Sequence, residues 1–426
     1  MNAKITSSDE NGFSIQIDFK YSTSMLDTEK QILNSINEAG NLATGKVLST
    51  FDANGSPIKI GNQVFTSKGL FNKSYQTPYG EVSVERHIYQ SHSGGKTHCP
   101  LEDKARIIIT STPRFAMIVS SKYSSLGVRP LINDLSTNHG RDMNVQIIQN
   151  IADAVGTFAI AKESSWEYEL PKLEKPVVGI SIGLDGTCML MKDDGWREAM
   201  TGTVSVYDKK GERMHTAYIA AAPEYGKEKF MANFEREVLR IKEKYSNVHV
   251  LGLADGARCN WNFLMKHSDY QLIDFYHATQ YIGKFSKIAF QDAKEREKWM
   301  EETCHNLKHN SNGAKNFLKE VQQFKEKNLK LKKVEREEIA AVETYFKNNL
   351  KLMKYSKIGE LNLPIGSGST EAACKVIVKE RMCKSGMRWK DEGANVVLTL
   401  RCLKQTDGRW DQFWNKVDRY GFERAA

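Results

Sequence analysis

The chain has 426 residues, enough for roughly two to four domains, and its 40% hydrophobic and 27% charged residues are typical of a folded globular protein. This composition excludes wholesale disorder and fibrous repeats. The net charge of +9 is compatible with a polyanionic partner such as nucleic acid, although proteins that bind no nucleic acid also reach this balance.

No apolar run reaches the ~20 residues that a membrane-spanning helix needs, and the first residues, MNAKITSSDENG, lack the pattern of a secretory signal. We therefore expect a cytosolic protein without a membrane partner. The seven cysteines include no Cys-x-x-Cys pair, which indicates reduced thiols. Histidine and cysteine gather at His87, His92, His98 and Cys99, but this spacing does not follow zinc-finger patterns, so we expect no zinc there.

Residues 1–100 are predicted to form a small β-containing region. A helical pattern covers 28–41, and alternating runs such as EVSVERHIYQ predict short strands. Residues 101–160 carry amphipathic patterns that predict short helices at 113–125, 128–137 and 143–155, joined by glycine-containing turns.

These short helices fit either a helix-turn-helix DNA-binding domain or a structural three-helix bundle. In a helix-turn-helix, the helix that begins near Asn144 would present amide side chains to base edges, and basic side chains would contact phosphates. The amide candidates are Asn144, Gln146, Gln149 and Asn150. The phosphate candidates are Arg114, Lys122, Arg129 and Arg141.

A connector at 162–176 is followed by a change to strand periodicity. Three successive strands, a helix and further strands predict a mixed sheet rather than a purely parallel one. The segments in chain order are VVGISIGLD, TGTVSVYD, MHTAYIAA, a helix at 226–245, VHVLGLAD and QLIDFY. Residues 277–354 are highly charged and predict helices, and the chain then returns to a glycine-rich turn, LPIGSGSTEAACK.

Three carboxylates lie where predicted strands or turns end. Asp185 and Asp255 each follow a strand and precede a glycine that would allow a sharp turn, and Glu371 lies in the first turn of a predicted helix. Carboxylates suit hard cations such as Mg²⁺, and two ions ~3.5 to 4 Å apart can assist phosphoryl displacement. Taken singly, each acid is also explained as a turn former or as a partner of the helix dipole.

Several segments resemble the ISKra-type bacterial insertion-sequence transposases. The resemblance covers about residues 81–420 and is carried by GLDGTCML, DGWREAMTGTVSVYD, AAPEYGK, LADGARCNW, DFYHATQYI, LPIGSGSTEAACKVIVKERMCKSGMRWK and GRWDQFWNKVDRYG. It implies a multidomain α+β and α/β protein with an RNase H-like, retroviral-integrase-type core and a DDE triad of Asp185, Asp255 and Glu371. The implied domains are a first part of the core at 175–284, a helical insertion at 285–360 and the C-terminal helices of the core at 361–426.

The same resemblance implies a DNA transposase that cleaves the ends of its element and joins them to target DNA. Two Mg²⁺ ions, for which Mn²⁺ could substitute, would bind the triad. Its partners would be double-stranded DNA, at the inverted repeats and the target, and further copies of the chain, in the nucleoid-associated cytoplasm of a bacterium. The alternatives are a catalytically silent DNA-binding regulator derived from a transposase and a structure-selective nuclease on the same core.

Other residues could assist such a site. His277 matches an Asp-x-x-His motif found after the second acid in some transposase families; it could contact a phosphate, move a proton, order the metal site or simply support a helix start. Arg258 could hold a phosphate or form a surface ion pair.

The stretch 372–404 carries eight basic and three acidic residues. The expected DNA contacts in it are Lys375, Lys379, Arg381, Lys384 and Arg388. Helical spacing would put Lys375, Lys379 and Met382 on one side. Trp389 could stack on an unpaired base, although packing in a core is the favoured interpretation.

Overall fold

The computed structural model describes residues 2–224, 227–254, 258–328 and 330–422. The chain divides into two compact units of mixed helix and sheet content. The first unit comprises Met1–Tyr168, Asn395–Lys404 and Arg409–Ala426, and the second comprises Glu169–Ala394 and Gln405–Gly408.

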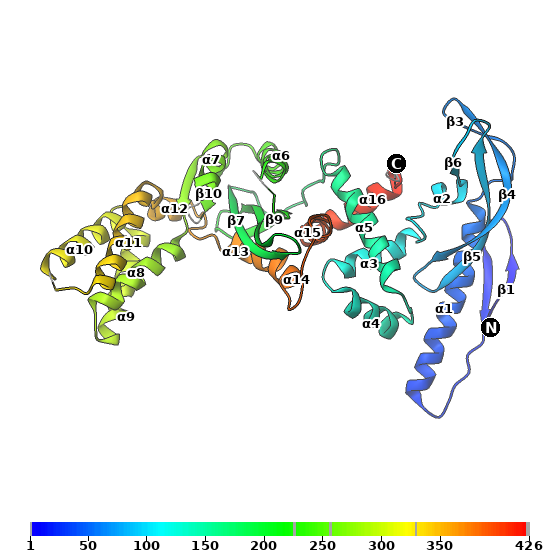
Figure 1. Cartoon of the computed structure of the whole chain (residues 1–426), viewed down its shortest axis with the longest axis horizontal. Coiled ribbons are helices and arrows are strands. Elements are labelled where there is room, and N and C mark those ends of the chain that lie inside the picture. The colour runs from blue at the N-terminus through cyan, green and yellow to red at the C-terminus, as the bar shows by residue number, and fades with distance from the viewer. Residues whose placement is uncertain (1, 225–226, 255–257, 329, 423–426) are drawn as a thin grey trace. The chain divides into compact units, whose positions relative to one another are not determined.

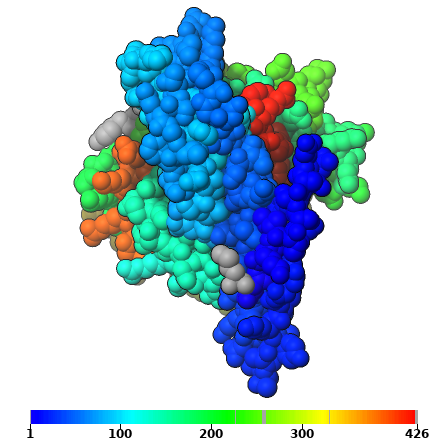
Figure 2. Space-filling model, turned by 90° about the vertical axis from the view of Figure 1, so that its right-hand side faces the viewer, coloured from blue at the N-terminus to red at the C-terminus, as the bar shows by residue number. Residues whose placement is uncertain are grey.

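The first unit begins with a hairpin, a long helix and an antiparallel sheet. The hairpin strands are β1 (Ala3–Ser8) and β2 (Phe13–Ile17), and the helix is α1 (Met25–Thr50). The sheet has the order β3 (Ile58–Ile60), β4 (Gln63–Gln76), β5 (Glu81–Ser91) and β6 (Gly94–His98). In the space-filling view these elements form one continuous blue surface (Figure 2). The small sheet predicted for this region is therefore present.

Helix α1 extends nine residues beyond the predicted end at 41 because two of its glycines allow close packing. A Cβ at Gly40 would lie 2.5 Å from the ring of Tyr79, and a Cβ at Gly45 would lie 2.7 Å from Val82. Glycine weakens a helical pattern in the sequence, yet here it lets the helix lie against the sheet.

Short helices complete the first unit. They are α2 (Pro100–Lys104), α3 (Pro113–Tyr123), α4 (Val128–His139) and α5 (Val145–Lys162), with most of α15 (Asp391–Gln405) and all of α16 (Arg409–Tyr420). The predicted starts of α3 and α4 are confirmed, and α5 runs seven residues beyond the predicted end at 155. The C-terminal helices differ from the predicted boundaries, which assigned all of 361–426 to the sheet core. They pack instead on α5, where Gly156 accommodates Val396 and Phe158 stacks on Phe422.

The second unit contains a five-stranded mixed sheet of order β11-β10-β7-β8-β9. Its strands are β7 (Gly179–Met191), β8 (Gly195–Tyr207), β9 (Arg213–Ala221), β10 (His249–Ala254) and β11 (Tyr270–Ile273). The first three pair antiparallel, whereas β10 is parallel to both β7 and β11. The predicted mixed sheet is thus confirmed.

Two local predictions within this sheet are wrong. Strand β7 does not turn at Gly186 but continues to Met191, because Asp185 and Gly186 pair with Thr201 and Met200 of β8. The predicted strand QLIDFY ends at Ile273, because Asp274 caps a helix that begins at Phe275.

Helices cover this sheet and extend from it. They are α6 (Glu228–Lys244), α7 (Arg258–His267), α8 (Phe275–Ala289), α9 (Ala293–His309), α10 (Gly313–Lys327), α11 (Lys333–Asn349) and α12 (Tyr355–Glu360), with the 3₁₀ turn η1 (Leu350–Leu352). The last part consists of α13 (Gly368–Ala373), the π-helical η2 (Cys374–Lys379) and α14 (Glu380–Met382). Helices α8 to α11 form a bundle at one end of this unit (Figure 1), with Phe285, Phe317 and Phe346 in its core. Within the described residues, no helix is long and apolar enough to cross a lipid bilayer.

The packing of α6 on β8 leads to a first prediction. Phe234 is fully buried and lies where a Cβ at Gly202 would come within 2.5 Å of its ring. Phe234→Ala should lower the free energy of unfolding by ~3 to 5 kcal/mol, because it leaves a cavity against the sheet. Leu239→Ala on the same helix is the control; this side chain is 50% exposed, so the change should stay within ~0.5 kcal/mol. Chemical denaturation followed by circular dichroism measures both, and equal effects would contradict the packing.

Candidate functional site

Helix α13 carries Glu371. The residue before Glu371, Thr370, holds this helix against the sheet. Thr370 is buried, and its Oγ1 lies 2.7 Å from Oγ1 of Thr203 on β8. A Cβ at Gly183 on β7 would lie only 1.9 Å from Oγ1 of Thr370, so glycine is required for this approach. The position of Glu371 beside β7 therefore follows from tight packing at its neighbour.

Asp185 lies on β7 and is linked to the same helical segment. Its Oδ1 accepts a hydrogen bond from the backbone N–H of Gly186 (2.7 Å), and its Oδ2 accepts one from the thiol of Cys374 (3.3 Å). Burial, reinforced by the nearby Asp185 carboxylate, raises the pKa of Cys374 to about 12. The thiol therefore stays protonated at neutral pH and keeps its hydrogen for Asp185.

The predicted second acid, Asp255, lies outside the described residues. The strand before it, β10, ends at Ala254 and pairs in parallel with β7, with Leu253 opposite Gly183. The carboxyl end of β10, where α/β proteins commonly bind ligands, therefore lies beside β7 two residues before Asp185, whereas β7 itself continues to Met191. Arg258 begins α7, and its side chain also lies outside what the structure describes.

A buried carboxylate joins α8 to the turn before α13. Asp274 has no exposed surface; its Oδ1 accepts the backbone N–H of His277 (2.7 Å) and caps α8. Its Oδ2 accepts the backbone N–H (2.5 Å) and the hydroxyl (2.8 Å) of Ser367. Asp274 therefore fixes the start of one helix relative to the start of the other.

This connection brings His277 to Glu371. The Nε2 atom of His277 lies 3.8 Å from Oε1 of Glu371, and the hydroxyl of Ser367 lies 3.3 Å from the same oxygen. One potential ligand atom from each of Asp274, His277 and Glu371 lies within 4.8 Å of the other two. Metal–ligand bonds of ~2.0 to 2.2 Å fit such separations, so these three residues could hold a divalent cation.

The sequence pointed to His277 and Glu371 but missed the supporting residues. The sequence pattern puts Asp274 in a strand and in the Asp-x-x-His motif, although an aspartate three residues before a helical N–H is also a capping signal. The roles of Ser367 and Cys374 had no local signal, because their partners lie far away in the chain.

The predicted basic surface after Glu371 is present in part. Lys375, Lys379, Lys384 and Arg388 are exposed. Arg381 is not, because its guanidinium is buried and lies 5.1 Å from the ring centre of Trp389. This burial disagrees with the predicted DNA contact.

The prediction that Lys375, Lys379 and Met382 lie on one side of a helix is also wrong. Lys375 and Lys379 are exposed, but Met382 is fully buried, because the π-helical η2 alters the residue spacing. Trp389 is half-buried and donates its indole N–H to the carbonyl of Met382 (2.8 Å), which agrees with the favoured core interpretation.

The candidate DNA contacts in the three-helix region have different environments. Arg141 is buried and donates to the carbonyl of Thr77 (3.2 Å) and to Gln76 (2.7 Å), so the prediction that it contacts phosphate disagrees with the structure. Lys122 pairs with Asp134, and Asn144 caps α5. Arg114, Arg129 and Gln146 are exposed, whereas Gln149 is half-buried.

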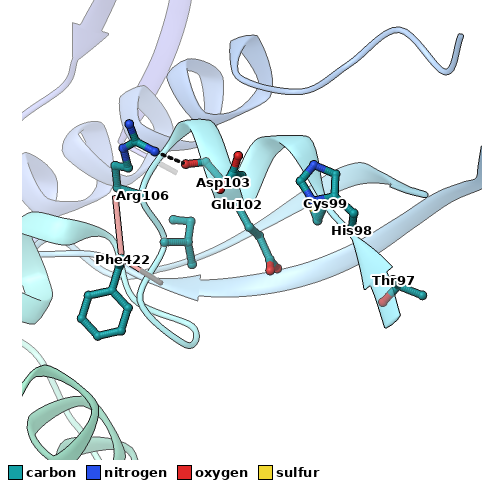
Figure 3. A pocket seen from close by; sticks show the side chains of 8 residues that line it. Thr97, His98, Cys99, Glu102, Asp103, Arg106 and Phe422 are labelled. Atoms are coloured by element: carbon teal, nitrogen blue, oxygen red, sulfur yellow. Dashed lines mark hydrogen bonds between the residues drawn. The ribbon is translucent and has the colours of Figure 1, made fainter. Parts of the chain in front are cut away.

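A polar hollow of about 260 Å³ lies in the first unit next to His98 and Cys99 (Figure 3). The buried carboxylate of Glu102 in its lining is already bonded to Lys73, Tyr75 and Arg86. Arg106 donates to the backbone carbonyl of Asp103. Among the described residues, the group suited to a cation is the one at Glu371 and does not include this hollow.

Comparison with known proteins gives no family for this chain. No protein-family model matches it, and no curated protein matches it.

The contribution of Asp274 to stability can be compared with that of an aspartate that only caps a helix. Asp274→Ala should lower the free energy of unfolding by about 3 kcal/mol, because it leaves buried donors of Ser367 and His277 without an acceptor. Asp292 also caps a helix, α9, but is exposed, so Asp292→Ala should cost only about 1 kcal/mol. Urea denaturation compares the two, and equal losses would show that Asp274 is an ordinary cap.

The protonated state of Cys374 predicts its reactivity. Because thiolates and not thiols react with alkylating reagents, the raised pKa should keep Cys374 unlabelled by iodoacetamide between pH 7 and about pH 10. Cys188 is exposed and should be labelled in the same sample. Peptide mass spectrometry measures both sites, and rapid labelling of Cys374 in the folded protein would contradict the assigned hydrogen bond to Asp185.

Proposed function

We propose that this chain is a DNA transposase with an RNase H-like core, which cleaves DNA at the ends of its element and joins them to target DNA. The observation that supports this most strongly is the connection between Asp185 on the central strand and Cys374, three residues after Glu371. This hydrogen bond supports a shared site because it joins the strand that carries Asp185 to the helical segment that follows Glu371. Asp255, which follows the parallel neighbour β10, is the proposed third member.

The donor atoms fit a divalent cation. Asp185 and Glu371 offer carboxylate oxygens, which are the preferred ligands of Mg²⁺ and Mn²⁺. Glu371 is exposed and could turn its carboxylate toward a ligand. When bound, a pair of such cations supplies positive charge to the attacking and leaving oxygens of an in-line displacement at phosphorus.

The remaining roles belong to the chain's own residues. In this proposal Asp185, Asp255 and Glu371 hold the cations, and Cys374 keeps the Asp185 carboxylate directed toward α13. His277 orients Glu371 and can take up a proton at Nε2 as the attacking oxygen loses one. Asp274 fixes the start of α8 relative to the turn before α13, and this keeps His277 close to Glu371.

The exposed cations provide contacts to DNA. Lys375, Lys379, Lys384 and Arg388 follow Glu371 closely in the chain, so they would hold the strands that enter the site. Arg114, Arg129 and Gln146 of the first unit would contact the element ends. Several copies of the chain would act together on two ends, in the cytoplasm near the bacterial nucleoid.

The test compares four carboxylate variants. Asp185→Asn, Asp255→Asn and Glu371→Gln should each abolish Mg²⁺- or Mn²⁺-dependent cleavage while leaving DNA affinity nearly unchanged. Glu380→Gln, an exposed acid further along the same segment, is the control and should retain activity. His277→Ala should reduce the rate about 10- to 100-fold, as loss of an orienting partner does.

The substrate is a duplex that carries the repeats flanking the coding region, and gel electrophoresis measures cleavage and joining. Full activity in Asp185→Asn or Glu371→Gln would contradict the proposed site. Binding without cleavage by the unaltered chain would identify a regulator, and cleavage without joining would identify a structure-selective nuclease.

A further inference from the structure

A cationic groove lies between α8 and α9, in the helical bundle of the second unit. This open groove has a volume of about 540 Å³, and its lining includes Lys284 and Lys287 of α8 and Arg296 of α9. Its other lining residues are Thr279, Gln280, Gly283, Ser286 and Met300, so none is acidic and all belong to the described part of the chain. Three basic residues therefore line this largely apolar groove, and no acidic residue lines it.

These cations differ from others in the same bundle. Lys325 and Lys347 both pair with the carboxylate of Glu343. Within the ranges that the structure describes, Lys284, Lys287 and Arg296 form no ion pair with a carboxylate, although the ammonium of Lys284 lies 4.8 Å from the ring centre of Tyr281. Their charge is thus available to an external anion.

One lining residue, Gly283, has no side chain. Glycine is unfavourable inside a helix, and internal packing does not require it here, because a Cβ would only come within ordinary contact distance of Met300, 3.6 Å. Glycine at such a position permits a close approach by an extended ligand.

Helix α8 leads from the candidate site to this groove. His277 lies in its first turn, and Tyr276, Gln280, Lys284 and Lys287 are exposed along it at intervals of three or four residues. Ten residues separate His277 from Lys287, which corresponds to about 15 Å at the rise of an α-helix. A DNA strand advances ~3.4 Å per nucleotide, so this distance spans roughly four to five nucleotides.

We propose that the groove between α8 and α9 binds the phosphodiester backbone of DNA, roughly four to five nucleotides from the bond that is cut. This role rests on the proposed function, since it places DNA at Glu371. Three basic residues along a groove, none of which pairs with a carboxylate in the described part of the chain, match the regular negative charge of a nucleic acid backbone. The groove should not distinguish one base from another, because its cations would contact phosphate oxygens and not bases.

The test uses the full chain and two variants of equal charge. The groove variant carries Lys284→Ala, Lys287→Ala and Arg296→Ala. The control carries Lys294→Ala, Lys298→Ala and Lys308→Ala, three exposed lysines of α9 that do not line the groove. Fluorescence anisotropy with a labelled duplex of random sequence gives the affinity at several KCl concentrations, without requiring catalysis.

The groove variant should lose affinity about tenfold or more at low salt, and the slope of log K against log salt should fall by about 2 to 3. The control should change much less. Equal losses in the two variants, or none in the groove variant, would overturn the groove assignment. Hydroxyl-radical footprinting should also show lost protection roughly four to five nucleotides from the cut.

The two proposals can fail separately. If the unaltered chain cleaves DNA and both variants bind alike, only the groove assignment is wrong. If the unaltered chain binds DNA without cleaving it, and the groove variant binds weakly, the groove assignment holds and the transposase proposal fails. If the unaltered chain does not bind DNA, both are wrong.

Discussion

The buried carboxylate of Asp274 is the interaction on which the candidate site depends. It accepts hydrogen bonds from the backbone of His277 and from the backbone and hydroxyl of Ser367. These donors belong to segments about ninety residues apart in the chain. Because a buried carboxylate is costly without such partners, the two segments are stable only together. The approach of His277 to Glu371 follows from this constraint.

A second constraint is steric. Gly183 on β7 leaves space for Thr370, which places α13 directly on the sheet, and Cys374 then reaches Asp185. Together the hydrogen-bonded and steric contacts hold the exposed Glu371 near both β7 and α8.

Much of the second unit could be predicted from local patterns. Strand periodicity in three successive segments, then a helix and another strand, was sufficient for the mixed sheet. The Asp-Gly pair at Asp185 favours a turn, but no turn forms there, because pairing with β8 outweighs the local preference of these residues. The cap at Asp274 was readable from its spacing to His277. The π-helical η2 and the burial of Arg141 and Arg381 depend on contacts distant in sequence and had no local signal.

The central claim is that Asp185, Asp255 and Glu371 bind divalent cations at one place. A crystal structure of the full chain soaked with Mn²⁺, with the ions located by anomalous scattering, tests it most directly. We expect ion peaks about 2.1 Å from carboxylate oxygens of Asp185 and Glu371, with Asp255 as a further ligand. Ions bound only by Asp274, His277 and Glu371, with Asp185 unliganded, would contradict it.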